Sequence, residues 1–291
     1  MLALIYKRLN EKDFKILYTL EKYMKKFEYV PVSLLERRCK LSPSELSLGL
    51  TKLNNLKLIK RKVGIYIGYQ LTWRGFDVLA IRALADKNVL SALGSKIGVG
   101  KESDIYEGLA PGDKRVIVKV HRVGRISFRQ TARVRTYMEK KEFMSWVEQS
   151  FEAAEREFIA LNELLKTEAL VPKPIGRNRH IVVIEYINGI LLLKLKEAMN
   201  PLEMLENIIE TLRKAYVDVG IVHGDLSAYN VMIELGTEKP YIIDWPQYVY
   251  KEHPSAMRLL ERDVKYIVGF FNRRFGLGLD YKKFIDYITK P

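Results

Sequence analysis

The first third of the chain places apolar residues at helical spacing. In residues 13–27 they recur every three or four positions, which predicts an amphipathic helix. Its predicted apolar face consists of Phe14, Leu17, Leu20, Tyr23, Met24 and Phe27. Pro31 then opens a second short helix, because proline in a first helical turn forfeits no hydrogen bond. This stretch therefore predicts two consecutive helices.

A third helix is signalled by its own start. Ser42-Pro43-Ser44-Glu45 has the form of a capping box, in which Ser42 caps the helix and Glu45 reaches back to it. The helix expected over residues 44–57 carries its apolar face on Leu46, Leu50, Leu53 and Leu56. Its other positions are mostly neutral, with no arginine to read guanine in a major groove. If this helix contacts a nucleic acid, its composition favours contact with the phosphate backbone over recognition of the base sequence.

The pattern changes to strands after the third helix. Residues 58–73 are rich in β-forming residues, and Gly64 and Gly68 are the turn candidates. A closing helix begins near Trp73, with apolar positions Phe76, Leu79, Ala80 and Ala83. Three helices, a hairpin and a closing helix resemble a winged-helix domain, which we assign to residues 1–84. Residues 85–94 are the expected connector.

From residue 95 the rhythm is strand, glycine turn, strand. Gly98 and Gly100 sit at a hairpin tip, where backbone amides can approach a phosphate closely. The strand-then-helix context of a Walker A loop is missing, and the stretch instead fits the kinase pattern G-x-G-x-x-G-x-V. Ser103 then stands for the third glycine and Ile105 for the valine. The candidate phosphate-binding residues are Gly98, Gly100, Lys101 and Ser103.

A lysine and a glutamate complete this predicted nucleotide site. Lys119 lies within an alternating apolar strand, where a charge is costly unless it is used, and would bind the α- and β-phosphates. Glu157 is its expected ion-pair partner, with Glu155 as the competing choice. The helix that carries it, expected over residues 150–165, has the apolar stripe Phe151, Ala154, Phe158, Leu161 and Leu165. Farther along the chain, backbone groups of Glu185 and Ile187 would contact the edge of the adenine base of the nucleotide.

The segment 121–135 contains five arginines and no acidic residue, so it predicts a phosphate- or RNA-facing loop or a mobile basic segment. Ser127 and Thr131 inside it are the candidate phosphoacceptors. The other histidines, His121, His180 and His253, show no metal-ligand spacing and are interpreted as surface or loop residues.

The strongest chemical signal is a loop followed by an acid. Residues 223–230 match the kinase catalytic pattern H-x-D-x-x-x-x-N, and Asp244 comes directly after an apolar strand. Asp225 would orient the acceptor and take its proton, while Asn230 and Asp244 would hold Mg²⁺ on the phosphates. His223 would brace the loop by hydrogen bonding. The ordered series from Gly98 to Asp244 makes coincidence remote.

Charge and composition narrow the setting. Among 291 residues, 49 are Lys or Arg and 35 are Asp or Glu, which gives a net charge of +14. Residues 1–90 hold 18 basic and 8 acidic residues, so +10 of this charge lies in the winged-helix region. The single cysteine, Cys39, excludes a disulfide within the chain and a cysteine zinc site. No apolar run could span a bilayer, so we expect a cytoplasmic protein without a membrane partner.

The basic residues of the first region are therefore candidates for nucleic-acid contact. They are Lys52, Lys57, Lys60, Arg61 and Lys62. The alternative is that the winged helix is a protein-docking module.

The sequence resembles the RIO family of atypical serine/threonine protein kinases, in its second, winged-helix-bearing subfamily. The resemblance rests on GVGKESDIY, VPKPIGRNRHIVVIEYING, HGDLSAYN and IIDWPQ, and it spans nearly the whole chain. It implies an α+β fold in which a minimal bilobal kinase domain, residues 95–291, follows the winged helix. The N-lobe would cover about 95–184 and the C-lobe about 188–291, without an activation loop or late C-lobe helices, and with Asp263 as the structural acid of the next helix.

The resemblance also implies ATP with Mg²⁺ (or Mn²⁺) as cofactors and a role in maturation of the small ribosomal subunit, whose precursor (rRNA and ribosomal proteins) would be the partner. Two activities stay open: phosphoryl transfer to Ser or Thr with Asp225 as base, or an ATPase switch through a transient phosphate on Asp244. The other classes are a small-molecule phosphotransferase like the aminoglycoside kinases, which need a larger helical substrate region, and a non-catalytic nucleic-acid-binding scaffold.

Overall fold

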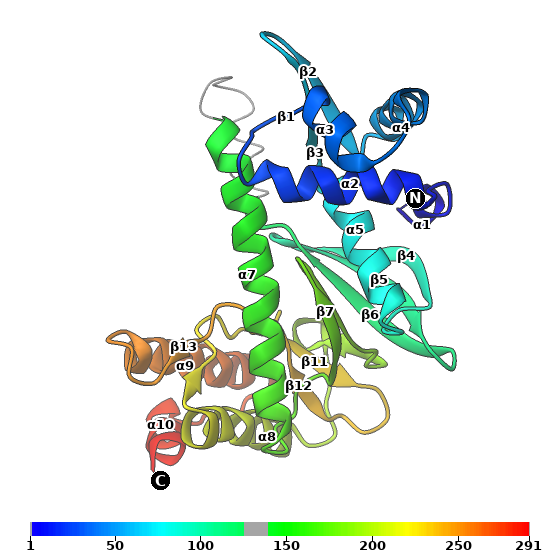
Figure 1. Cartoon of the computed structure of the whole chain (residues 1–291). Coiled ribbons are helices and arrows are strands. Elements are labelled where there is room, and N and C mark those ends of the chain that lie inside the picture. Colours follow the sequence, from blue (N-terminus) through cyan, green and yellow to red (C-terminus); the bar gives the residue numbers. More distant parts are fainter. Residues whose placement is uncertain (1, 125–138, 291) are drawn as a thin grey trace. The chain divides into compact units, whose positions relative to one another are not determined.

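The computed structural model of the chain describes residues 2–124 and 139–290. It divides into two compact units. The first comprises Met1–Phe151 with Arg177–Val183, and the second comprises Glu152–Gly176 with Ile184–Pro291. Figure 1 gives the order of the elements along the chain.

The first unit opens with a winged-helix domain, as predicted. Its three-stranded antiparallel sheet has the order β1-β3-β2, and the β2–β3 hairpin, which we call the wing, projects from the helices (Figure 1). The elements are α1 (Leu2–Tyr6), α2 (Glu11–Met24), β1 (Val30–Pro31), α3 (Val32–Cys39), α4 (Pro43–Asn55), β2 (Ile59–Val63), β3 (Ile67–Leu71) and α5 (Trp73–Asp86).

Helix α4 forms for the predicted reason. Ser42 accepts a hydrogen bond from the Glu45 amide, and the Glu45 carboxylate accepts one from the Ser42 amide, so the capping box is complete. All four leucines of the predicted apolar face are buried. Thr72 caps α5 by accepting from the Gly75 amide, without the reciprocal bond of a capping box.

Three details of this region differ from expectation. Phe27 is exposed, because α2 ends at Met24 and leaves it beyond the helix. Pro31 is the residue before α3 and also part of β1, a strand the sequence did not predict. Gly68 lies inside β3 and not in a turn; a Cβ there would come within 2.8 Å of the Tyr29 side chain, so the glycine permits a close approach.

A five-stranded sheet with the order β4-β5-β6-β8-β7 follows the winged helix. The first three strands are antiparallel neighbours, and Val116, Val118 and Val120 of β6 are buried as the alternation predicts. The strands are β4 (Ala92–Val99), β5 (Ser103–Ala110), β6 (Lys114–His121), β7 (Pro174–Asn178) and β8 (Ile181–Glu185). Because α5 runs to Asp86 and β4 begins at Ala92, the link between them is shorter than the connector expected over 85–94.

The long helix α7 (Glu139–Leu165) begins well before residue 150, where the sequence placed its start. Ala154 and Leu161 of the predicted stripe are buried, and Phe151 and Phe158 are partly buried. Leu165 is 39% exposed, whereas Leu164 is fully buried. After Leu161 the buried stripe therefore continues with Leu164, three residues on. The prediction that Leu165 belongs to the apolar stripe was wrong.

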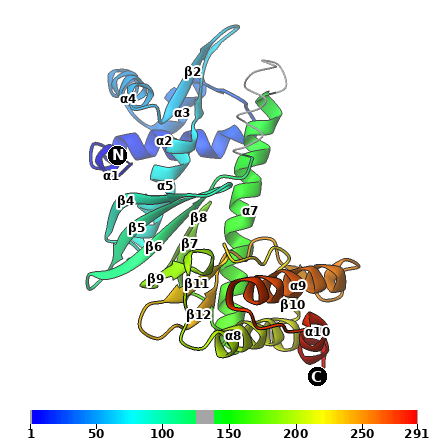
Figure 2. The same ribbon diagram turned by 180° about the vertical axis from the view of Figure 1, so that it is seen from behind.

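The second unit is mainly helical around two small sheets. One sheet has the order β12-β11-β9 and the other pairs β10 with β13. Helices α8, α9 and α10 pack against one another (Figure 2). The elements after β8 are β9 (Gly189–Leu191), η1 (Leu192–Lys194), α8 (Pro201–Lys214), η2 (Ala215–Val219), β10 (Ile221–Val222), β11 (Val231–Glu234), β12 (Pro240–Ile242), β13 (Val249–Tyr250), α9 (Ala256–Phe275) and α10 (Tyr281–Thr289).

Two further features bear on the prediction of a minimal kinase domain in a protein that does not span a membrane. Between Asp244 and the start of α9 at Ala256 the chain forms only the two-residue strand β13, so the long segment of an ordinary activation loop does not occur there. Across the described residues, no helix has both the length and the apolarity needed to cross a lipid bilayer.

Candidate active site

The glycine hairpin, which we define as β4, β5 and the residues between them, lies in the first unit. The Gly100 amide donates to the Ser103 carbonyl at 2.8 Å, and the register shifts between Lys96 and Gly98. A Cβ at Gly100 would come 2.9 Å from the Ser103 hydroxyl oxygen, so the Ser103 side chain would have to rotate away. A Cβ at Gly98 would meet only Ile105, at 3.5 Å, which is ordinary contact. Packing against Ile105 therefore does not require glycine at this position, and contact of Gly98 with a phosphate stays a prediction.

Lys119 lies on β6 opposite Ile105 of the glycine hairpin. Only 6% of this lysine is exposed, between the buried Val118 and Val120. A buried ammonium group is costly unless an anion faces it. The burial of Lys119 is therefore typical of a lysine whose ammonium group pairs with an anion. Lys101, in contrast, is exposed at the tip of the hairpin.

Glu157 lies on α7 within the second unit. It is 1% exposed, whereas Glu155 is exposed to solvent, so burial agrees with the choice of Glu157. Lys119 and Glu157 belong to different units, and their ion pair stays a prediction.

The catalytic loop, residues 223–230, is held by hydrogen bonds within the second unit. The buried ring of His223 donates from Nε2 to the Ile243 carbonyl at 3.1 Å and accepts at Nδ1 from the Asp225 amide at 3.2 Å. The Asn230 side-chain amide donates to the Asp225 carbonyl at 2.8 Å, and the Asn230 carbonyl accepts from the Ile243 amide at 2.9 Å. These bonds bring Asp225 and Asn230 next to the strand end that carries Asp244.

The electrostatics of His223 support its predicted bracing role. Burial lowers the pKa of the ring, although Asp263 and the Ile243 carbonyl act in the opposite direction. A neutral ring that already uses both nitrogens does not accept a substrate proton. The hydrogen bonds of Asp225 run through its backbone, and its role as the base of the loop stays a prediction.

Helix α9 also braces the catalytic loop. The Asp263 carboxylate, 1% exposed, accepts from the Gly224 amide at 2.8 Å, and Arg262 donates to the Gly224 carbonyl. Gly224 has a left-handed φ of 77°, and a Cβ there would lie 2.9 Å from the Gln247 carbonyl oxygen. Asp263 thus occupies the structural position that the resemblance implied for it, and only glycine fits the loop at 224.

Asp244 follows β12 in a strained backbone conformation. Its φ of 68° lies in the left-handed region, which aspartate adopts more readily than most residues and which recurs at functional sites. The next residue, Trp245, is fully buried and donates from its indole nitrogen to the Ile242 carbonyl at 3.0 Å. The Trp245 ring also packs 4.6 Å from that of His223, so the catalytic loop and the Asp244 turn share one core.

Arg156, which no sequence pattern singles out, also fixes this turn. Its guanidinium donates from Nε to the Pro246 carbonyl at 2.9 Å and from Nη2 to the Tyr248 carbonyl, and lies 4.3 Å from the Tyr248 ring centroid. Arg156 therefore ties α7, next to Glu157, to the segment that follows Asp244.

At the predicted adenine edge, the Glu185 amide donates to the Lys173 carbonyl at 2.9 Å, and the Glu185 side chain accepts from the Lys173 amide at 2.7 Å. The backbone group of Glu185 left for a base is thus its carbonyl. Ile187 is partly buried two residues beyond it.

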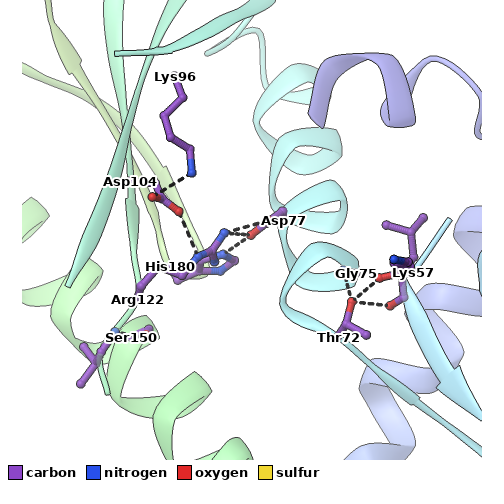
Figure 3. Close-up of polar contacts among 11 residues, drawn as sticks. Lys57, Thr72, Gly75, Asp77, Lys96, Asp104, Arg122, Ser150 and His180 are labelled. Atoms are coloured by element: carbon purple, nitrogen blue, oxygen red, sulfur yellow. Dashed lines mark hydrogen bonds and ion pairs between the residues drawn. The ribbon is translucent and has the colours of Figure 1, made fainter. Parts of the chain in front are cut away.

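The interpretation of His121 as a surface or loop residue was wrong, because His121 ends β6, whereas His180 lies in the loop between β7 and β8 but is not at the surface. His180 is fully buried and His121 is 3% exposed, and the His121 amide donates to the His180 carbonyl at 2.8 Å. Only His253 is exposed, as expected. His180 belongs to a buried cluster with Asp77 and Arg122 that sequence reasoning also missed (Figure 3). Asp77 lies 45 residues from Arg122 and 103 from His180 along the chain, so no local pattern reveals the cluster.

The candidate nucleic-acid residues have different surroundings. Lys60, Arg61 and Lys62 are exposed along β2, and Lys57 is exposed at the end of α4. Lys52 instead forms an ion pair with the buried carboxylate of Asp13, which neutralises much of its charge. The candidate phosphoacceptors Ser127 and Thr131 lie outside the described residues.

The donor set also fits a magnesium site that a nucleotide completes. Among the described residues, no group of three or more His, Cys, Asp or Glu side chains could hold a metal ion. Mg²⁺ in kinase sites takes only one or two protein oxygens and binds phosphates with the rest. Asp244 and the Asn230 side-chain oxygen would supply such a pair, since the Asn230 nitrogen already donates to the Asp225 carbonyl.

Comparison with known proteins agrees with this geometry. A family model described as the RIO domain matches residues 104–284, and one described as the Rio2 N-terminal domain matches residues 6–87. The chain is 36% identical over 276 residues to the "RIO-type serine/threonine-protein kinase Rio2" of Methanocaldococcus jannaschii, covering 92% of this chain and 100% of that protein. This chain belongs to the Rio2 group of RIO kinases.

Other Rio2 kinases match over nearly the same length. The "Serine/threonine-protein kinase rio2" of Schizosaccharomyces pombe is 33% identical, covering 96% of this chain and 80% of that protein. A crystal structure of "the Rio2 kinase-ADP/Mg2+-phosphoaspartate complex" from Chaetomium thermophilum is 31% identical, with a TM-score of 0.85, covering 99% of this chain and 89% of that one. The chain is therefore an ATP-dependent serine/threonine-type kinase, and the predicted α+β fold of winged helix plus RIO kinase domain is confirmed.

Proposed function

We propose that this Rio2 kinase binds Mg²⁺-ATP with the residues described above and transfers or hydrolyses its γ-phosphate. The observation that carries the proposal is the bonded frame of the second unit, in which His223 and Asn230 join the catalytic loop to the strand end at Asp244. Such a frame holds a base and two magnesium oxygens in fixed positions, and phosphoryl transfer depends mainly on positioning and charge stabilisation.

Each residue has a role that follows from its surroundings. The backbone of the glycine hairpin lies on the phosphates, and the buried Lys119 neutralises charge on them. Asp225 orients the acceptor hydroxyl and receives its proton, while neutral His223 keeps Asp225 in place. When bound, Mg²⁺ would neutralise charge on the transferred γ-phosphoryl group and on the ADP that leaves.

The second route of the proposal makes Asp244 itself the acceptor. Its carboxylate oxygen forms a bond to the γ-phosphorus as the bond to ADP breaks, and water then cleaves the acyl phosphate to give inorganic phosphate. The phosphoaspartate named for the Chaetomium protein supports this route. In it the enzyme works as an ATPase switch and not as a kinase for another protein.

Incubation with γ-labelled ATP separates the two routes. Acid-stable phosphoserine or phosphothreonine at stoichiometric levels supports transfer to a hydroxyl, whereas a base-labile label with release of free phosphate supports the switch. Asp244→Ala should weaken Mg²⁺-ATP binding by about 10-fold or more, because removal of a metal ligand costs at least as much as removal of a residue that orients one. Unchanged binding in this variant would contradict the assignment of Asp244.

We further propose that the wing contacts RNA in a precursor of the small ribosomal subunit, in the cytoplasm. Between Glu45 and Asp77 the chain has six Lys or Arg and no acidic residue, which suits a polyanion. The hairpin tip adds exposed apolar side chains, with Ile65 fully exposed and Val63 at 66%. The salt dependence of binding to a structured RNA fragment tests the charged part of this interaction.

A further inference from the structure

A buried polar cluster lies where the last helix of the winged-helix domain faces the kinase strands of the same unit. Its centre is Asp77 on α5, which is 3% exposed. Both Asp77 carboxylate oxygens accept from Arg122 Nη2 at 2.8 Å, and Oδ1 also contacts His180 Nε2 at 2.8 Å (Figure 3). We call Asp77, Arg122, His180 and Asp104 the Asp77 cluster.

The charges in the Asp77 cluster are settled by their surroundings. Burial would raise the pKa of Asp77, but the Arg122 guanidinium and the His180 hydrogen bond outweigh it, and the pKa lies below its ordinary value. Burial lowers the pKa of His180 to about 4, so its ring is neutral near pH 7. Asp77 and Arg122 therefore form a buried ion pair, and His180 completes it as a hydrogen-bond donor.

Arg122 connects this pair to the glycine hairpin. It directly follows β6, three residues after Lys119, and its amide donates to the Glu102 carbonyl at 2.6 Å. Its Nε lies 3.6 Å from Asp104 Oδ2, and Asp104 Oδ1 in turn faces Lys96 Nζ at 2.9 Å. The Arg122 side chain thus links α5 of the winged helix to Asp104 on β5, and Asp104 continues the link to Lys96 on β4 (Figure 3).

The winged-helix domain has a second charge pair of the same kind that avoids the hairpin. Arg179, in the turn between β7 and β8, donates to both oxygens of Glu21 on α2. If these ion pairs only attached the winged helix to the kinase strands, loss of Asp77 and loss of Glu21 would have the same kind of effect on the protein. Of these two pairs, the one at Asp77 continues into the hairpin that is assigned to the phosphates.

We propose that Asp77 and Arg122 are positioning residues for nucleotide binding, through which the winged helix fixes the glycine hairpin over the phosphates. The inference rests on the proposed Mg²⁺-ATP site. It predicts that loosening the Asp77 cluster weakens recognition of the phosphates and leaves recognition of the adenine base unchanged. The backbone predicted to contact the adenine, at Glu185 and Ile187, belongs neither to the Asp77 cluster nor to the glycine hairpin.

The test compares two ligands, Mg²⁺-ATP and adenosine, which has no phosphates. Arg122→Lys keeps the charge but loses the paired hydrogen bonds to Asp77 and the Nε interaction with Asp104. We expect calorimetry to show about tenfold weaker binding of Mg²⁺-ATP. Adenosine affinity should stay within about twofold of the wild type. Glu21→Gln is the matched control and should alter neither affinity, although it also removes a pair between the winged helix and the kinase strands.

The outcomes separate the inference from its alternatives. Equal weakening of both ligands, or no weakening in a folded Arg122→Lys variant, overturns the positioning role and leaves the cluster as domain attachment. Asp77→Asn serves if Arg122→Lys does not fold, and failure of both to fold likewise overturns the proposal in favour of a purely structural core. A wild-type chain that binds adenosine and Mg²⁺-ATP equally well would instead count against the proposed phosphate site itself.

Discussion

The catalytic loop and the wing differ in how firmly the rest of the chain holds them and in how much of them is exposed. The loop at 223–230 is held from two sides, by Ile243 behind the strand end and by Asp263 from α9, and its histidine is buried. The wing leaves four of five β2 residues exposed and carries a fully exposed Ile65 at its tip. Chemistry on a phosphate needs atoms fixed in place, whereas attraction to a polyanion needs charge that solvent and partner can reach.

The sharpest way to break this comparison is Asp225→Asn. The hydrogen bonds that hold Asp225 use its backbone, so the variant should fold and keep its melting temperature. Loss of the base should lower turnover by about 10²–10⁴-fold, measured as phosphate release from saturating Mg²⁺-ATP. ATP affinity should change little, because the magnesium oxygens remain. A variant that turns over ATP at the wild-type rate would remove Asp225 from the chemistry.

Gly224→Ala tests whether the rigidity of the loop matters. The added Cβ combines a left-handed φ with an approach of 2.9 Å to the Gln247 carbonyl oxygen, so the loop must shift. We expect a loss of about 1–3 kcal/mol in the free energy of unfolding and a marked fall in turnover.

The control for this change is Gly236→Ala in the same unit. Gly236 has a φ of 89° but nothing within 4 Å of the added Cβ, so its variant carries backbone strain alone. That variant should lose about 1 kcal/mol of stability and keep its turnover. Equal turnover in the two variants would show that the catalytic loop tolerates displacement.

Sequence reasoning did best where the signal is local. The capping box at Ser42 and Glu45 and the hairpin around Gly98 and Gly100 both depend on a few neighbouring residues. It failed where distant segments decide. His180 has no local mark of burial, because its partner Asp77 lies 103 residues away.

The same limit explains the missed positioning residues. Arg122 looks like one more cation in a basic segment, and only the fold shows that its charge faces Asp77 and Asp104. Arg156 likewise reads as a solvated helix residue, although it reaches carbonyls 90 and 92 residues away. Spacing predicts which residues share an element, but the pairing of charges between elements depends on tertiary packing.

On the wing side of the comparison, charge reversal should weaken RNA binding without touching the chemistry. Lys60→Glu, Arg61→Glu and Lys62→Glu together should lower affinity for structured RNA and reduce the slope of log K against log salt by about 0.9 for each duplex phosphate that the wing no longer neutralises. ATP turnover should be unchanged. Reversal of Lys282, Lys283 and Lys290, which are exposed in and after α10, makes the same change in net charge. An equal effect from that control would mean that total charge, and not the wing, attracts RNA.

The smallest expected effect separates the apolar tip of the wing from its charge. Ile65→Ser removes an exposed apolar side chain without altering charge, so the variant should bind RNA more weakly while the salt slope stays constant. Burial of an isoleucine side chain is worth about 1.5–3 kcal/mol, and partial burial at a hairpin tip should therefore change affinity by roughly tenfold or less. Met199→Ser, at a residue that is 78% exposed in the second unit, is the control for a general loss of surface apolarity. A changed slope in Ile65→Ser would mean that the tip only orients the lysines, whereas an unchanged affinity would confine RNA binding by the wing to Lys60, Arg61 and Lys62.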